Sequence, residues 1–162
     1  MKKILVSFLT VFGSFGFAGH PALAADTGVI TLSGSIGVVN EIEITQFDVA
    51  TSLNIVDGES NALVATVTET SNSPTGYTIY MNSVNDSNLI NSANGEETAP
   101  YTVSYDGGSP VALTTADLAM KTVGVLGGLV TDESDVLINL TGNSAASSGT
   151  FADVITVSIA AN

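Results

Sequence analysis

Short turn signals recur along the chain, and the stretches between them have room for β-strands and for little else. The signals are Asp57-Gly58, Ser73-Pro74-Thr75-Gly76, Asn94-Gly95, Asp106-Gly107-Gly108, Gly127-Gly128 and Gly142-Asn143. Apolar and polar residues alternate between them, as in Tyr77 to Met81 and Tyr101 to Tyr105, which is the period of a half-buried strand. We therefore predict an all-β chain with six to eight strands from Ile42 onward, arranged as an immunoglobulin-like sandwich or a partly open barrel. Only Thr114 to Met120 favours a helical turn.

The first 24 residues have the pattern of a secretory signal peptide. Two lysines precede an apolar run from Ile4 to Gly19, and Ala22-Leu23-Ala24 offers the small residues of a cleavage site. A retained membrane helix is the alternative, but the run is short for one. Cleavage after Ala24 predicts an exported chain that does not insert in the membrane. Its remaining length suits one domain, which we place at residues 41–162 behind an N-terminal extension at 25–40.

The charge of the exported chain is strongly negative. Lys2, Lys3 and His20 leave with the signal, so one basic residue, Lys121, stands against all 16 acids, which is a formal charge of −15. Such a surface repels nucleic acid and anionic lipid. Disorder is a rival explanation of high charge, but 44% of the residues are hydrophobic, which favours a folded domain.

Enzyme chemistry has little support in these residues. The chain has no cysteine, and its one histidine lies in the signal, so the common general base and the strongest nucleophile are missing. No phosphate loop or dinucleotide motif is present, and we expect neither an enzyme nor a cofactor. The four tyrosines, Tyr77, Tyr80, Tyr101 and Tyr105, could form a sugar-binding face, but strand tyrosines are more often core and cross-strand pairs.

Two charged features leave alternatives open. Asp132-Glu133-Ser134-Asp135 could bind calcium through its oxygens, but the spacing matches no EF-hand loop, and a solvated turn before a strand at Val136 is the simpler interpretation. Asp57-Gly58-Glu59 has the same two alternatives, a calcium site or a solvated turn, and the turn is again the simpler interpretation. Lys121 could form an isopeptide bond with an asparagine, and the simpler interpretation is a lone exposed lysine.

The extension carries a second alternating row. Ile30, Leu32, Gly34, Ile36 and Val38 fall on one face of a strand, with Thr31, Ser33, Ser35 and Gly37 between them. At the other end, Phe151, Ile155, Val157 and Ile159 form the last apolar row, which Asp153 interrupts. The chain therefore has an extra strand at its front and no further partner for its last strand.

These residues resemble a known family. Ile30-Thr31-Leu32-Ser33-Gly34-Ser35-Ile36 is similar to the donor strand of chaperone–usher pilins, and Gly149 to Ser158 resembles their terminal strand. "PYTVSYDGG" (100–108) and "LTTADL" (113–118) are similar to the middle of the cysteine-free colonisation-factor pilins and the related spore-coat-U-like group. Many type 1-like pilins have a cysteine soon after the donor stretch, where this chain has Glu41-Ile42-Glu43.

The resemblance implies a major pilus subunit with an incomplete immunoglobulin-like sandwich that lacks its last strand. Ile30, Leu32, Gly34, Ile36 and Val38 would fill the groove of a neighbouring subunit by donor-strand complementation, a form of β-augmentation. The implied partners are other copies of the chain, a periplasmic chaperone and an outer-membrane usher, with a tip adhesin as a further candidate. The implied location is the fimbrium, reached through the periplasm, with a role in adhesion or biofilm formation. An exported monomeric adhesive or matrix protein with a complete sandwich is the alternative.

Overall fold

A computed structural model describes residues 28–162. The predicted signal peptide and residues 25–27 lie outside the described residues. Contacts divide the chain into two units, one ending at Ser35 and one running from Ile36 to Asn162. Residues 28–35 form no helix or strand, and the second unit contains the whole fold. No helix among residues 28–162 has the length and apolar character needed to cross a membrane.

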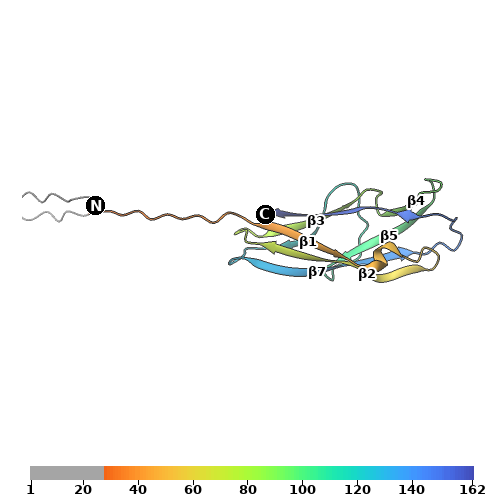
Figure 1. The fold of residues 1–162 in the computed structure, drawn as a ribbon, viewed down its shortest axis with the longest axis horizontal. Helices are drawn as coiled ribbons and strands as arrows, with labels where there is room; N and C mark the ends of the chain where they lie inside the picture. The colour runs from red at the N-terminus through yellow and green to blue at the C-terminus, as the bar shows by residue number, and fades with distance from the viewer. Residues whose placement is uncertain (1–27) are drawn as a thin grey trace, which may run out of the picture. The chain divides into compact units, whose positions relative to one another are not determined.

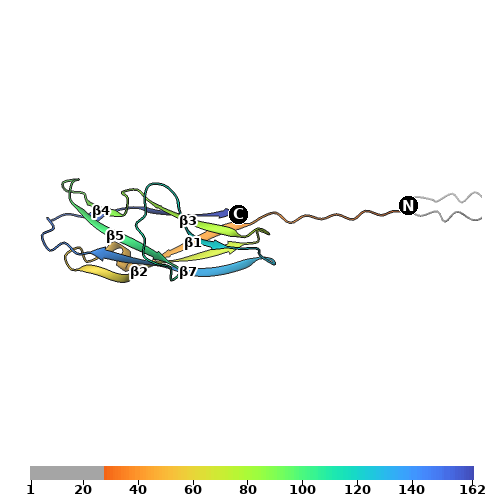
Figure 2. The same cartoon turned by 180° about the vertical axis from the view of Figure 1, so that it is seen from behind.

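The second unit is a β-sandwich, as predicted, and each strand pair in it is antiparallel. Figures 1 and 2 show its two layers. The larger sheet has the order β1 (Asn40–Gln46), β2 (Gly58–Ser71), β7 (Val130–Thr141), β5 (Thr98–Tyr105), β4 (Asn88–Asn91) and β8 (Phe151–Ala152). The smaller sheet has the order β6 (Leu118–Val123), β3 (Tyr77–Ser83) and β9 (Ile155–Ala161). A 3-10 helix, η1, covers Asp48–Thr51 between β1 and β2.

The core lies between the sheets because the alternating apolar residues of both layers face inward. Ile79 and Met81 of β3 are fully buried against Val67 of β2 and Val103 of β5, among others. Tyr77, Tyr101 and Tyr105 are also buried, while Tyr80 is only partly so. The interpretation of the tyrosines as core residues is therefore confirmed for three of the four.

Two of the predicted turns contain a glycine whose backbone is in the left-handed region, which residues with a side chain rarely adopt. Gly76 has φ +90°, and a Cβ placed there would lie 2.0 Å from the carbonyl oxygen of Val123. Gly58 has φ +83° in the turn that leads into β2. Side chains are excluded at both positions, so these two glycines fix the turns where the sequence placed them.

Two local predictions are wrong. Thr114 to Met120 forms no helical turn: Leu118 and Ala119 begin β6, where they pair with Met81 and Tyr80 of β3. Asp132 to Asp135 is not a turn before a strand but the first half of β7, paired residue by residue with β2. In both stretches pairing with a neighbouring strand outweighs the local preference of polar residues for turns.

Candidate functional site

Two edge strands, β1 and β9, lie next to each other and belong to different sheets. Among the described residues β1 pairs only with β2, and β9 pairs only with β3. Each strand therefore has one edge whose backbone N–H and C=O groups have no partner strand. We call the side of the sandwich between these two edges the open margin.

An apolar hollow of about 340 Å³ lies in the open margin. Its lining comes from both sheets and from η1: Gln46, Ala50, Leu53, Val64, Ala65, Leu89, Tyr101, Val136, Ile138, Asp153, Val154, Ile155 and Val157. Ten of these residues are aliphatic, and Asp153 is the only one with a charge. On β9 the residues that face the core, Ile155, Val157 and Ile159, are only half-buried. The hollow is thus suited to apolar side chains on an extended segment.

Asp153 is the charged residue in the lining of the hollow. The chain enters the larger sheet at β8, leaves it at Asp153-Val154, and joins the smaller sheet as β9. At that crossing the Asp153 carboxylate accepts hydrogen bonds from the hydroxyls of Tyr101 and Ser83, both at 2.6 Å, and from the Asn85 amide at 3.1 Å. The carboxylate has four donors when its neighbouring Val154 amide is counted. These donors hold the carboxylate in place, so it serves as a fixed anchor at the crossing.

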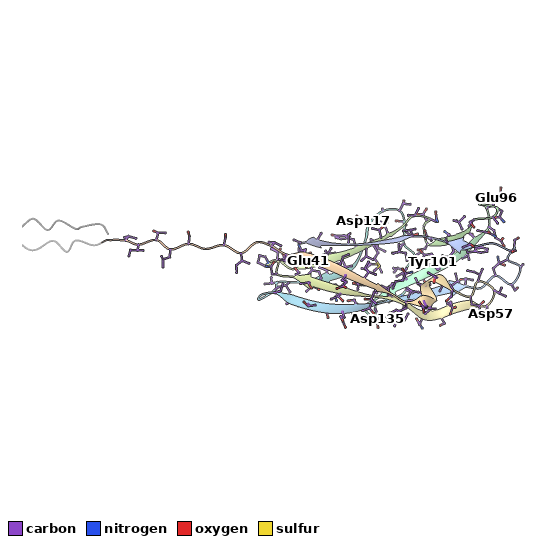
Figure 3. All side chains as sticks on the ribbon, viewed as in Figure 1. Glu41, Asp57, Glu96, Tyr101, Asp117 and Asp135 are labelled. Carbon is purple, nitrogen blue, oxygen red and sulfur yellow. The ribbon has the colours of Figure 1, made fainter. Side chains whose placement is uncertain are left out.

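Tyr101 reaches this anchor from inside the sandwich, and Figure 3 shows it between the two layers. Burial raises the pKa of its hydroxyl above the ordinary value of 10.0, and the hydrogen bond to the Asp153 carboxylate raises that pKa further. The hydroxyl consequently stays protonated and keeps donating to Asp153 throughout the physiological pH range.

The predicted donor residues lie at residues 30–38, where the structure has no strand. Leu32 is 89% exposed and Ile36 is 91% exposed, and Ile30 is similar, while Val38 is less so at 60%. A Cβ on Gly34 would meet no atom within 4 Å. Residues 28–38 also contain no charged side chain. Large apolar side chains exposed in such number over a short segment are unusual at a protein surface.

The opposite side of the smaller sheet, at β6, has a different construction, and we call it the closed margin. The Lys121 ammonium of β6 reaches across to the larger sheet. It lies 3.1 Å from Glu69 of β2, 2.8 Å from Asp132 of β7, and 3.1 Å from Asp106 after β5. The Lys121 side chain is 12% exposed, so the interpretation as a lone exposed lysine is wrong.

Glu69 is the innermost member of this cluster and is fully buried. Its carboxylate accepts a hydrogen bond from the Tyr77 hydroxyl at 2.7 Å and a second one from the Tyr105 hydroxyl. Burial and the hydrogen bond to Glu69 raise the pKa of both tyrosines. Burial opposes the charge on Lys121, but its hydrogen bonds to Asp132, Asp106 and Glu69 outweigh that effect and raise its pKa.

The sequence predicted the donor row as a site, but it did not group the residues of the hollow or those of the closed margin into sites. One signal for the hollow was present: Asp153 interrupts the last apolar row at the point where the chain changes sheet. The closed margin had a signal as well: Glu69 is an acid at an inward-facing position of the alternating β2 pattern. Its partner Lys121 could not be identified, because their contact joins residues 52 positions apart in two different sheets.

The acids prominent in the sequence do not gather into a metal site. Among residues 28–162, no group of three or more histidine, cysteine, aspartate or glutamate residues is arranged to hold a metal ion. Asp132, the first acid of the predicted calcium stretch, is paired with Lys121, and Asp57 bonds to Asn54 in the turn before β2.

Comparison with known proteins gives a distant likeness to a solved pilin structure. No family model matches the chain, and no curated protein matches it. Among solved structures, the CooA pilin subunit from enterotoxigenic Escherichia coli is similar over 72% of this chain and 87% of the pilin, with 16% identity and a TM-score of 0.37. At that TM-score the likeness carries no weight of its own, and function has to be argued from the open margin and the extension.

Proposed function

We propose that the chain is a structural pilus subunit that polymerises head-to-tail, with residues 28–38 of one copy inserted as a strand in the open margin of the next. The observation that carries the proposal is the coexistence of an acceptor and a donor in one chain. The acceptor is an apolar hollow between two unpaired strand edges. The donor is an exposed, uncharged segment with apolar residues at every second position.

The dimensions of the two parts agree. The nine residues from Ile30 to Val38 span about 30 Å as a strand, and the seven residues of β9 span about 23 Å. A donor of this length would pair along all of β9 and still reach the hollow. Because one surface of each copy meets a different surface of the next, the contact is heterologous and extends into a fibre.

The free energy available from burial of the donor side chains is large. Full burial of Ile30, Leu32, Ile36 and Val38 would contribute about 6–12 kcal/mol at ~1.5–3 kcal/mol for each side chain, and strand hydrogen bonds would add to it. None of this requires a charge to leave water, because the segment has none. Gly34 interrupts the row, and we place it where the groove is too shallow for a side chain.

The remaining features follow from the same proposal. An open margin left bare would aggregate, so a chaperone would cover it until a neighbour's strand replaces the chaperone at an usher. The fibre would lie on the cell surface and serve adhesion or biofilm formation, and we assign the subunit no catalytic role. A high negative charge keeps such a crowded surface soluble.

The test compares two substitutions in the donor row with one beside it. Leu32→Asp buries an unpaired charge in the groove, and Gly34→Val overpacks it, at a cost of about 1–3 kcal/mol. Ser33→Asp introduces the same charge on the opposite face of the strand and is the matched control. SDS-resistant ladders of refolded subunits should be lost with Leu32→Asp, weakened with Gly34→Val and retained with Ser33→Asp.

An added Gly28–Asn40 peptide distinguishes a folding defect from an assembly defect. Leu32→Asp subunits should bind this wild-type peptide and gain the far-UV spectrum of a complemented sandwich, since their own groove is intact. If Leu32→Asp and Gly34→Val subunits ladder like the wild type, the donor-strand proposal is wrong. A wild-type chain that stays monomeric over days with a cooperative melt would support the monomeric alternative.

A further inference from the structure

Asn72 holds the residues that lead from the extension into β1. It follows directly after β2, and its backbone amide donates to the Val39 carbonyl at 3.1 Å. Its side chain makes two further hydrogen bonds: Oδ1 accepts from the Val39 amide at 2.6 Å, and Nδ2 donates to the Gly37 carbonyl at 2.9 Å. Residues 37–39 are therefore kept in line with β1, beyond the last strand pair, Asn40 with Ser71.

This alignment matters because the extension is attached to the strand that borders the open margin. A reversal at residues 37–39 would fold residues 28–36 back along the free edge of β1 and fill the chain's own hollow. The local sequence permits such a reversal, since Gly37 can adopt either sign of φ and a Cβ there would meet no atom within 4 Å. In the structure Gly37 is not among the glycines with positive φ.

Self-insertion would compete strongly with assembly. A segment tethered by a short linker acts at an effective concentration of about millimolar or more, far above the concentration of a second subunit in dilute solution. Unless the path is blocked, the chain's own extension would occupy the groove first and end growth. A contact that opposes the reversal therefore decides between a capped monomer and a fibre.

We propose that Asn72 is a positioning residue that holds Gly37 to Val39 in line with β1 and so reserves the open margin for the extension of a second copy. This inference rests on the proposed function. Asn72→Ala removes both side-chain hydrogen bonds but keeps the backbone bond to Val39. Asn72→Asp keeps an acceptor for the Val39 amide and loses the donor to the Gly37 carbonyl, so its effect should be intermediate.

The experiment uses the absence of cysteine from the chain. Ser33→Cys and Ser158→Cys place one thiol on the outer face of the extension and one on the outer face of β9, where neither disturbs the apolar row. The exported chain is unfolded, refolded at several concentrations and treated with a short bis-maleimide. A link within one chain gives a compact monomer, and links between chains give a ladder.

The wild-type background should give ladders that grow with protein concentration. In the Asn72→Ala background the ratio of internally linked monomer to ladder should rise by about fivefold or more, since two hydrogen bonds are lost, and the monomer fraction should no longer depend on concentration. Asn94→Ala is the matched control, because Asn94 similarly bonds the Glu96 and Glu97 amides in a turn away from the extension. A merely destabilised fold would lower both products together.

Two results would overturn the inference, and they differ. If Asn72→Ala gives ladders and monomers in the wild-type ratio, the role of Asn72 is wrong and the donor-strand proposal stands. If the wild-type background gives neither ladder nor internal link, the extension does not enter any groove, and both proposals fail.

Discussion

The two margins of the sandwich differ in side-chain chemistry: one is mainly charged and the other mainly aliphatic. At the closed margin a lysine from the smaller sheet reaches a fully buried glutamate in the larger sheet, and two tyrosines and two aspartates surround the pair. At the open margin aliphatic residues line a hollow, and two strand edges have no partner strand among residues 28–162. Charged side chains join the two sheets at the closed margin, and apolar side chains line the open margin, where we propose that a donor strand enters.

This division has a physical reason. A buried ion pair contributes little net stability, yet removal of one partner leaves an uncompensated charge that costs about 3–5 kcal/mol. Such a contact tolerates few alternatives and fixes how the sheets meet. An apolar groove is far less selective, because burial is non-directional, and it can accept first one strand and then another. The two margins should therefore respond differently to substitution and to added donor peptide.

The largest expected effect is that of Lys121→Met, which breaks the closed margin. Glu69 would remain buried without its cation, and the free energy of unfolding should fall by about 3–5 kcal/mol. The measurement is urea unfolding of the subunit with and without saturating Gly28–Asn40 peptide. Because the cluster lies at β6 and the peptide would bind beside β9, the loss should be equal in both conditions.

The double variant Lys121→Met with Glu69→Gln separates charge from packing. Without the buried charge, much of the lost stability should return. If the single variant loses less than about 1 kcal/mol, the ion pair is not what closes this margin. If the loss depends on the peptide, the two margins are coupled and do not act independently.

Alkaline pH should weaken the closed margin through three titrating groups, whereas the open margin has one such group, Tyr101. Tyr77, Tyr105 and Lys121 all have raised pKa values in the folded state, so they bind their protons more tightly there than in the unfolded chain. The stability they add is present below their ordinary values of 10.0 and 10.5 and is lost as pH rises through the folded values. The free energy of unfolding should decline above about pH 10.

The tyrosines provide the control for this pH dependence. Tyr77→Phe removes one of the groups that titrate in the cluster and should flatten the decline, whereas Tyr80→Phe, on the outer side of β3, should leave the profile unchanged. Unfolding monitored between pH 8 and 12 distinguishes the two variants. A profile that stays flat in the wild type, or that Tyr80→Phe alters as much as Tyr77→Phe, would contradict the assignment.

The difference between the margins also explains what could be predicted from the sequence. Turn glycines such as Gly76 and the alternation from Tyr77 to Met81 are local signals, and both predicted the fold correctly. The donor row at Ile30 to Val38 is local as well, and it was identified, although its insertion is still a prediction. The error at Thr114 to Met120 arose because pairing with β3, not local preference, decides the state of that stretch.

The acceptor could not be predicted in the same way. The hollow is formed by residues from separate parts of the chain, and most of them are aliphatic residues that the sequence does not distinguish from the rest of the core. Whether Val157 or Ile138 borders a gap depends on how the sheets meet, which is set by long-range contacts such as that of Lys121 with Glu69. Asp153 and Glu69 were the visible clues, since acids at inward positions need nearby donors or a cation.

The smallest expected effect comes from Asp132→Asn, which removes the outermost carboxylate of the closed margin. Asp132 lies 2.8 Å from the Lys121 ammonium, but its side chain is 53% exposed, so solvent screens the pair and the loss should be below about 1 kcal/mol. The hydrogen bond from Lys121 lowers the pKa of Asp132 below its ordinary 3.8. The stability that the pair adds is therefore present above the ordinary pKa and disappears as pH falls through the lowered pKa of the folded state.

Urea midpoints of the Asp132→Asn variant and the wild type should differ slightly at pH 7 in low salt, and they should converge in about 1 M salt and in acid. Asp135→Asn, three residues along on the outer face of β7, is the matched control: Asp135 is not one of the three carboxylates paired with Lys121, so this variant should leave the contact between Lys121 and Asp132 intact. A loss of several kcal/mol for Asp132→Asn would mean that the exposed carboxylate, not buried Glu69, is the main partner of Lys121, and that the closed margin is held from its surface rather than from its interior.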